Sequence, residues 1–154
     1  MTTTLAPEQN LADTMAKLEN ALLSPLVSGE LSGWVHTVQE AAATLAVDLA
    51  SYLRTVLHVQ YDEIAQADSE MSAHVEKLLV GDQQLLEQMT GFHEELHKLA
   101  AAAEHVQKNE GKLAELRKRV EDNGLALILG IKKQQAAATT WLAEAHYRDR
   151  GVGD

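Results

Sequence analysis

The sequence predicts an all-α protein in which three long helices and a shorter N-terminal helix form an up-down antiparallel four-helix bundle. Two observations favour this fold. Apolar residues recur at spacings of three and four along most of the 154-residue chain, as they do on the buried face of a helix. Glycine and proline, which interrupt helices, fall at widely separated points. No segment shows the strict apolar–polar alternation typical of a strand. A single helical domain over residues 1–154 is therefore expected.

The helix breakers divide the chain into four expected helices. Pro7 suits the first turn of a helix, where its missing N–H is no loss, and Pro25 ends the apolar repeat that follows. The long second segment divides best at Asp68, a residue type that caps helix N-termini. In the last segment, Asp122-Asn123-Gly124 predicts a break or kink. The expected helices are about 8–24, 34–67, 69–108 and 112–148.

The third expected helix has the most regular apolar pattern, and one residue in this pattern is charged. The residues at the three-and-four spacing form a seam along the helix, and they are Met71, Val75, Leu78, Asp82, Leu85, Met89, Phe92, Leu96, Leu99, Ala103 and Val106. Burying a carboxylate without a partner is strongly unfavourable. If the second and third helices form a hairpin that turns near residue 68, Arg54 lies level with Asp82. The sequence therefore predicts a buried Arg54–Asp82 pair that fixes the register of the two helices, and Gln60 and Gln134 are candidates for a similar role.

Histidines and carboxylates are the residues that could carry chemistry, because the chain has seven histidines and no cysteine. His58 and Asp62 stand one helical turn apart on the second helix, where a metal site and an exposed ion pair are both possible. If the hairpins turn near residues 68 and 110, Glu63, His74 and His146 come level at one end of the bundle. Two histidines and a carboxylate with open coordination positions would suit a first-row metal ion.

A second group of ligand-type residues lies on the third helix. His93 and His97 are one turn apart, and Glu94-x-x-His97 has the spacing found in ferritin-like di-iron proteins. No second Glu-x-x-His occurs in the chain. On a regular helix Glu94 and His97 point largely to water, and His93 lies on the flank of the apolar face, where a packed histidine is the alternative to a metal ligand.

Charge and hydropathy narrow the possible partners and location. The chain has 13 Lys and Arg against 23 Asp and Glu, a formal net charge of −10. This charge argues against nucleic acid or an anionic membrane as a partner. The longest apolar run covers residues 125–131, far short of the roughly 20 residues that span a bilayer. The N-terminus is neither basic nor apolar, so a cytoplasmic location is expected.

The chain resembles the hemerythrin-like (HHE cation-binding) family. The resemblance rests on a short first helix followed by three helices and on His58-Val-Gln-Tyr-Asp62, a His-x-x-x-carboxylate on the second helix. It also rests on the C-terminal segment Glu144-Ala-His-Tyr-Arg-Asp-Arg-Gly-Val-Gly-Asp154. This resemblance implies an up-down four-helix bundle whose histidines and carboxylates hold a non-haem di-iron centre. Members serve in oxygen binding or sensing, iron handling or iron–sulfur repair.

The chain departs from the family's pattern at most of the ligand positions. The first helix has no histidine, and the third has Asp82 where the family offers a histidine in its seam. The fourth helix has Lys132-Lys133-Gln134-Gln135 where the family offers a histidine and an acid. Only His58 and Asp62 carry over, with Glu63 as a substitute for Asp62, and on a regular helix these side chains face away from the predicted core.

Three functions are compatible with these observations. The first is a hemerythrin-like bundle with an incomplete or lost metal site, which acts by binding or regulation rather than by turnover. The second is a functional non-haem iron protein, with one or two metal ions, for oxygen or iron handling; its candidate ligands are His58, Asp62, Glu63, His74 and His146. The third is a helical module for self-association or protein interaction through the faces of the bundle. No grouping of Ser, His and Asp supports a hydrolase.

Overall fold

The computed structural model of this chain describes residues 6–25, 29–105 and 110–152. Within these ranges the regular elements are all helical, and no strand occurs, so the predicted all-α class is confirmed. The elements are α1 (Ala6–Leu23), α2 (Leu31–Tyr52), the π-helix η1 (Leu53–Leu57), α3 (His58–Ala67), the 3-10 helix η2 (Ser69–Met71), α4 (Ser72–Ala103) and α5 (Glu110–Val152).

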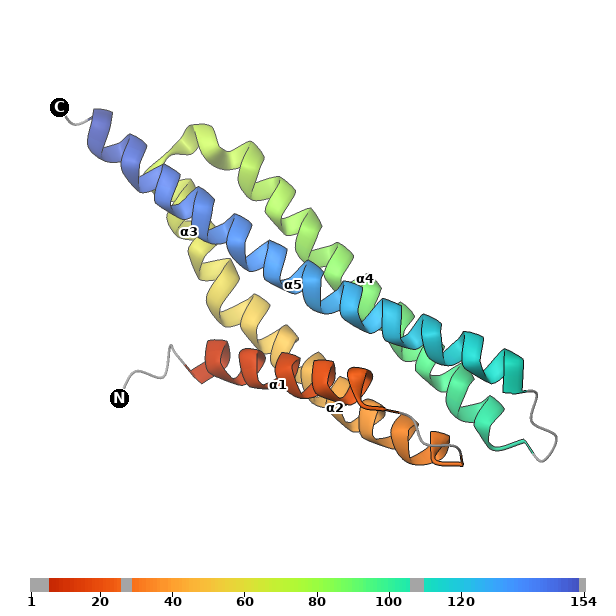
Figure 1. Cartoon of the computed structure of the whole chain (residues 1–154). Coiled ribbons are helices and arrows are strands. Elements are labelled where there is room, and N and C mark those ends of the chain that lie inside the picture. Colours follow the sequence, from red (N-terminus) through yellow and green to blue (C-terminus); the bar gives the residue numbers. More distant parts are fainter. Residues whose placement is uncertain (1–5, 26–28, 106–109, 153–154) are drawn as a thin grey trace.

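Three long segments, α2–η1–α3, α4 and α5, pack side by side, and the short α1 covers only part of their length. In Figure 1, α2, η1 and α3 form one continuous rod, α4 leaves this rod after η2, and α5 lies along α4. Helix α1 packs against α2 and α5, whereas α3 packs against α4 and α5. Helix α5 therefore packs against α4 and α1 over one part of its length, and against α4 and α3 over the part that α1 does not reach. The core continues through both regions as one cluster of buried apolar side chains.

The second expected helix is interrupted by the π-helix η1. Buried positions along α2 follow the three-and-four spacing of a regular helix at Val38, Ala42, Leu45, Leu49 and Tyr52. A π turn accommodates one additional residue per turn, so the positions that follow it move to a different face. The buried residues that follow are Leu57, Tyr61 and Ile64. An uninterrupted helix would instead continue the buried face through Val56 and Gln60, which are only half-buried.

The predicted apolar seam of the third helix forms the centre of the core. Its buried members on η2 and α4 are Met71, Leu78, Asp82, Leu85, Met89, Phe92, Leu96, Leu99 and Ala103, with Val75 half-buried. Helix α4 ends at Ala103, earlier than the expected 108. Val106 lies outside the described residues. Among the side chains that the structure describes, Asp82 is the only charged one that is buried.

The predicted break at Asp122-Asn123-Gly124 is wrong, because α5 continues as one helix from Glu110 to Val152. Gly124 has a different purpose. A Cβ atom at this position would lie 2.5 Å from Leu22 Cδ1 and 3.0 Å from Phe92 Cε1, and both side chains are fully buried. Similarly, a Cβ atom at Gly130 would lie 3.1 Å from Leu85 Cδ2. These glycines allow α5 to approach its neighbours closely.

Two glycine-to-alanine substitutions test this explanation. Gly91, on α4, has no atom within 4 Å of the Cβ that alanine would add. Gly91→Ala should therefore raise the free energy of unfolding by about 0.5–1 kcal/mol through helix propensity alone. Gly124→Ala should lower it by about 1–3 kcal/mol, since Leu22 and Phe92 cannot move into solvent. Urea denaturation of both variants measures the difference. Equal stabilisation of the two would show that α1 and α4 do not close over Gly124.

Candidate functional site

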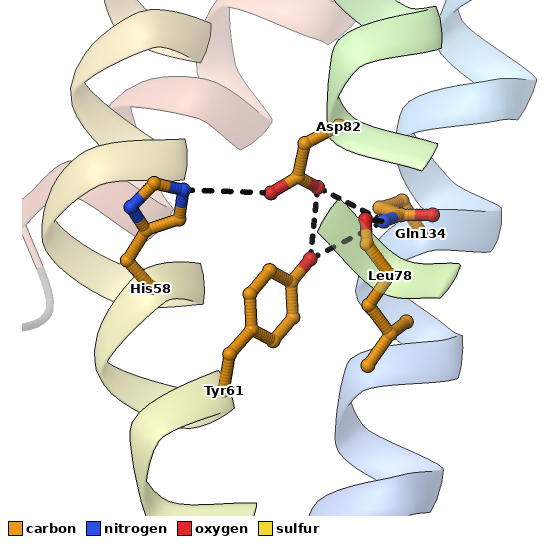
Figure 2. A network of polar contacts seen from close by, with 5 residues as sticks. All are labelled: His58, Tyr61, Leu78, Asp82 and Gln134. Carbon is orange, nitrogen blue, oxygen red and sulfur yellow. Dashed lines mark hydrogen bonds and ion pairs between the residues drawn. The ribbon is translucent and has the colours of Figure 1, made fainter. Parts of the chain in front are cut away.

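A polar network lies in the core between α3, α4 and α5, centred on the Asp82 carboxylate (Figure 2). The Tyr61 hydroxyl on α3 donates a hydrogen bond of 2.8 Å to Asp82 Oδ1. The Gln134 amide on α5 donates to the same oxygen at 2.9 Å. The amide nitrogen also lies 2.6 Å from the Leu78 carbonyl oxygen and 3.2 Å from the Tyr61 hydroxyl. Three helices are thus joined through one carboxylate oxygen.

The second carboxylate oxygen, Oδ2 of Asp82, is in a different situation. It is buried and has no hydrogen-bond partner among the described residues. The Nε2 atom of the His58 imidazole lies 3.8 Å away, and the His58 side chain is 53% exposed. Figure 2 shows this imidazole facing the carboxylate from the α3 side. His58 therefore connects the buried carboxylate with the surface.

Burial controls the protonation of the network. Asp82 is only 5% exposed, and burial raises the pKa of its carboxyl, although the hydrogen bonds from Tyr61 and Gln134 and the nearby His58 oppose the shift. Burial, together with its hydrogen bond to Asp82 and the carboxylate's charge, raises the pKa of Tyr61 further above its usual value of 10.0. The Tyr61 hydroxyl therefore stays protonated and acts as a donor.

Two local features of the backbone make the network possible. The π-helix η1 brings Tyr61 to the buried face, and His58, three residues before it, lies on the adjacent position. On α4, Gly81 provides room for the side chain from α5. A Cβ atom at Gly81 would lie 2.5 Å from Gln134 Oε1 and 2.7 Å from Gln134 Nε2. A glycine beside Asp82 is thus required for the Gln134 amide to reach both the carboxylate and the Leu78 carbonyl.

The partners of Asp82 differ from the predicted Arg54. Asp82 is buried, but Arg54 is exposed and lies within η1. The groups in the described ranges that contact the carboxylate are instead Tyr61, Gln134 and His58. The hairpin turns through residues 68–71 rather than at 68, and this moves the residues level with Asp82 by about one helical turn. Gln134 was a candidate from its seam position, whereas Tyr61 was missed because a regular helix places it outside the apolar stripe.

The other candidate ligands are only partly brought together. His146 Nε2 lies 3.8 Å from Glu63 Oε2, and both side chains are about half exposed. The His74 ring instead stacks on Trp141, with centroids 3.9 Å apart and an interplanar angle of 19°. Asp62 is exposed. Within residues 6–25, 29–105 and 110–152, no group of three or more His, Asp or Glu side chains is placed to hold a metal ion.

Comparison of the chain with protein-family models, with curated proteins and with solved structures finds no match. The resemblance to hemerythrin-like proteins therefore rests only on the sequence features given above, which are the order of the helices, the segment from His58 to Asp62 and residues 144–154. None of the helices in the described part of the chain has both the length and the apolar composition needed to cross a membrane.

The charge on Asp82 can be separated from its hydrogen bonds by two substitutions. Asp82→Ala removes the acceptor from Tyr61 and Gln134 and should lower the free energy of unfolding by about 1–3 kcal/mol. Asp82→Asn keeps an acceptor oxygen but removes the buried charge, so it should raise the stability at pH 8 by the order of 1 kcal/mol. Urea denaturation measures both.

The effect of Asp82→Asn should depend on pH. The pKa of Asp82 is raised in the folded state above its usual value of 3.8, so between these two pKa values the folded state binds more protons than the unfolded state. Wild-type stability therefore falls as the pH rises through this interval. The advantage of Asp82→Asn should grow from near zero at pH 3.8 to a plateau above the folded-state pKa. An advantage that is independent of pH would contradict burial of the charge.

A third test addresses Gly81. Gly81→Ala should displace the Gln134 amide and lower the free energy of unfolding by about 1–3 kcal/mol. In a Gln134→Ala background the same substitution meets no amide, so it should cost nothing or stabilise slightly through helix propensity. A double-mutant cycle by urea denaturation measures the coupling. Additive effects would show that Gly81 and Gln134 do not meet.

Proposed function

We propose that this protein is a hemerythrin-like up-down four-helix bundle in which a hydrogen-bonded polar network replaces the metal centre, and that it acts by binding rather than by turnover. The observation that carries the proposal is the occupation of Asp82 Oδ1 by both Tyr61 and Gln134. Asp82 stands where the family offers a histidine, and Gln134 lies in the stretch that would offer a histidine and an acid. In this chain these positions hydrogen-bond to each other.

The donor set of the network does not fit a di-iron centre. Gln134 contributes a neutral amide nitrogen, which is a donor and not a ligand. Tyr61 holds its proton strongly, and its hydroxyl is already directed at the carboxylate. One carboxylate and one histidine remain, which is fewer than the histidines and carboxylates that two iron ions require. The network instead satisfies a buried charge and sets the register of three helices.

Binding through a face of the bundle is supported by large apolar side chains that the fold leaves at the surface. On α3 and α4, close in sequence to the network, these are Val59, Leu79, Val80 and Leu86. Leu79 and Leu86 are seven residues apart and so lie two turns apart on one side of α4. The partner in this proposal is a protein, with a second copy of this chain as one candidate. Nucleic acid is not, because the net charge is −10.

One observation favours a functional metal protein as the second candidate. Asp82 Oδ2 has no hydrogen-bond partner in the described ranges, and His58 Nε2 lies 3.8 Å from it. A carboxylate oxygen and an imidazole nitrogen at this separation can bind one ion. Water or an exogenous ligand would have to complete the coordination.

Metal analysis distinguishes the two candidates. Protein expressed with added iron is purified without chelators and analysed by inductively coupled plasma mass spectrometry and visible absorption, with His58→Gln as the matched variant. We expect substoichiometric iron in both proteins, and a zinc and manganese content that His58→Gln leaves unchanged. Stoichiometric metal in the wild type that His58→Gln abolishes would overturn the proposal in favour of the metal protein.

Association is tested on the same preparation. Light scattering coupled to size exclusion reports the mass, and crosslinking of cell extracts reports protein partners. Leu79→Lys and Leu86→Lys should weaken any complex, whereas Leu129→Lys, an exposed residue on α5, is the control. A strict monomer that crosslinks to no protein at these positions would exclude binding through this face of α4.

A further inference from the structure

The strongest unassigned group of side chains lies on α4, away from the buried network. Residues 93–97 read His-Glu-Glu-Leu-His, in the C-terminal third of the continuous helix Ser72–Ala103. His93 and His97 are therefore one turn apart on the same side of the helix. Together with Thr90, Glu94 and Lys98 they line one shallow surface hollow.

The two imidazoles are available to a ligand. In the described part of the chain neither His93 nor His97 has a hydrogen bond or ion pair, and the only ring contact of His93 is with Phe92, with centroids 6.3 Å apart. Four of the other five histidines are engaged: His58 with Asp82, His146 with Glu63, His36 with Glu40, and His74 with Trp141. His93 is half-buried and His97 is exposed, so the pair has one anchored and one accessible ring.

The order of these residues has a defined chemical meaning. In a His-Glu-x-x-His segment on a helix, the two imidazoles can reach one Zn²⁺ ion, and the glutamate that follows the first histidine lies beside the water bound to that ion. Here the histidines are His93 and His97, and the glutamate is Glu94. Two imidazoles leave open coordination positions, which water fills.

The surrounding charges favour a cation. Glu94 lines the same hollow as the two histidines, and the chain as a whole has a net charge of −10. Lys98, the cation among the residues that line this hollow, is paired through Nζ with Glu95 Oε1 at 3.4 Å. This pair is directed along the helix and compensates the charge that would otherwise repel a metal ion.

We propose that His93 and His97 form a surface site for a divalent first-row metal ion, with Zn²⁺ as the preferred occupant and Glu94 as the residue that contacts its bound water. The proposal is independent of the function of the buried network. His93 is 11 positions along α4 from Asp82, which corresponds to roughly 16 Å of helix. No ion bound at one position can be shared with the other.

Isothermal titration of the metal-stripped full chain with ZnCl₂ at pH 7.5 tests the proposal. We expect one Zn²⁺ per chain at this site. His97→Gln and, separately, His93→Gln should weaken this binding by about tenfold or more, because each leaves a single imidazole. Circular dichroism confirms that the variants fold; His97 is exposed, so its substitution should leave the helix content unchanged.

Two control variants define the outcome. His105→Gln and His58→Gln should leave the titration unchanged, and the second distinguishes this site from any metal bound at Asp82. Retention of full affinity in His97→Gln, or no measurable uptake of Zn²⁺ by the wild type, would overturn the proposal. Equal weakening by His105→Gln would also overturn it, because it would indicate scattered adsorption to surface histidines.

Discussion

Burial of the Asp82 carboxylate is the constraint on which the arrangement of α3, α4 and α5 depends. A charged group in an apolar core requires donors close by, and each donor here requires a change in a helix. Tyr61 reaches the carboxylate because the π-helix η1 brings it to the buried face. Gln134 reaches it because Gly81 has no side chain. The π-helix η1, Gly81 and Gln134 lie far apart in the sequence. All three are needed to place hydrogen-bond donors at the Asp82 carboxylate.

The periodicity of the sequence predicted the buried face of α4 because the seam residues from Val75 to Ala103 lie on that one helix, where spacing alone determines the face. It also identified Asp82 as the residue that needed an explanation. The partners of Asp82 could not be predicted in the same way. They depend on where the hairpin turns and on one additional residue in η1, and neither leaves a local pattern. An error of one turn in the register selected Arg54 instead of the His58–Tyr61 region.

The glycines also show that packing between helices cannot be predicted from a local sequence pattern. Gly124 follows Asp122 and Asn123, a combination that indicates a break when the neighbouring helices are unknown. In the folded protein a glycine is needed at position 124 because Leu22 of α1 and Phe92 of α4 occupy the space that a Cβ atom would take. Gly91 lies in a helix with open space around it. The sequence does not show that a side chain fits at Gly91 and not at Gly124, because this difference lies in which helices pack against each position.

The histidines differ in whether they lie beside the buried charge of Asp82. His58 is held beside the buried carboxylate, where its imidazole partly compensates a charge that burial disfavours. A metal ion there would compete with that role and with the donors on Oδ1. His93 and His97 do not contact the buried carboxylate, so an ion bound to them disturbs none of its interactions. Because such an ion would bind only while α4 is helical, its binding free energy would add directly to the stability of the folded state. Ion binding and folding would then be coupled through the exposed side of α4, while the carboxylate at its buried side keeps the register.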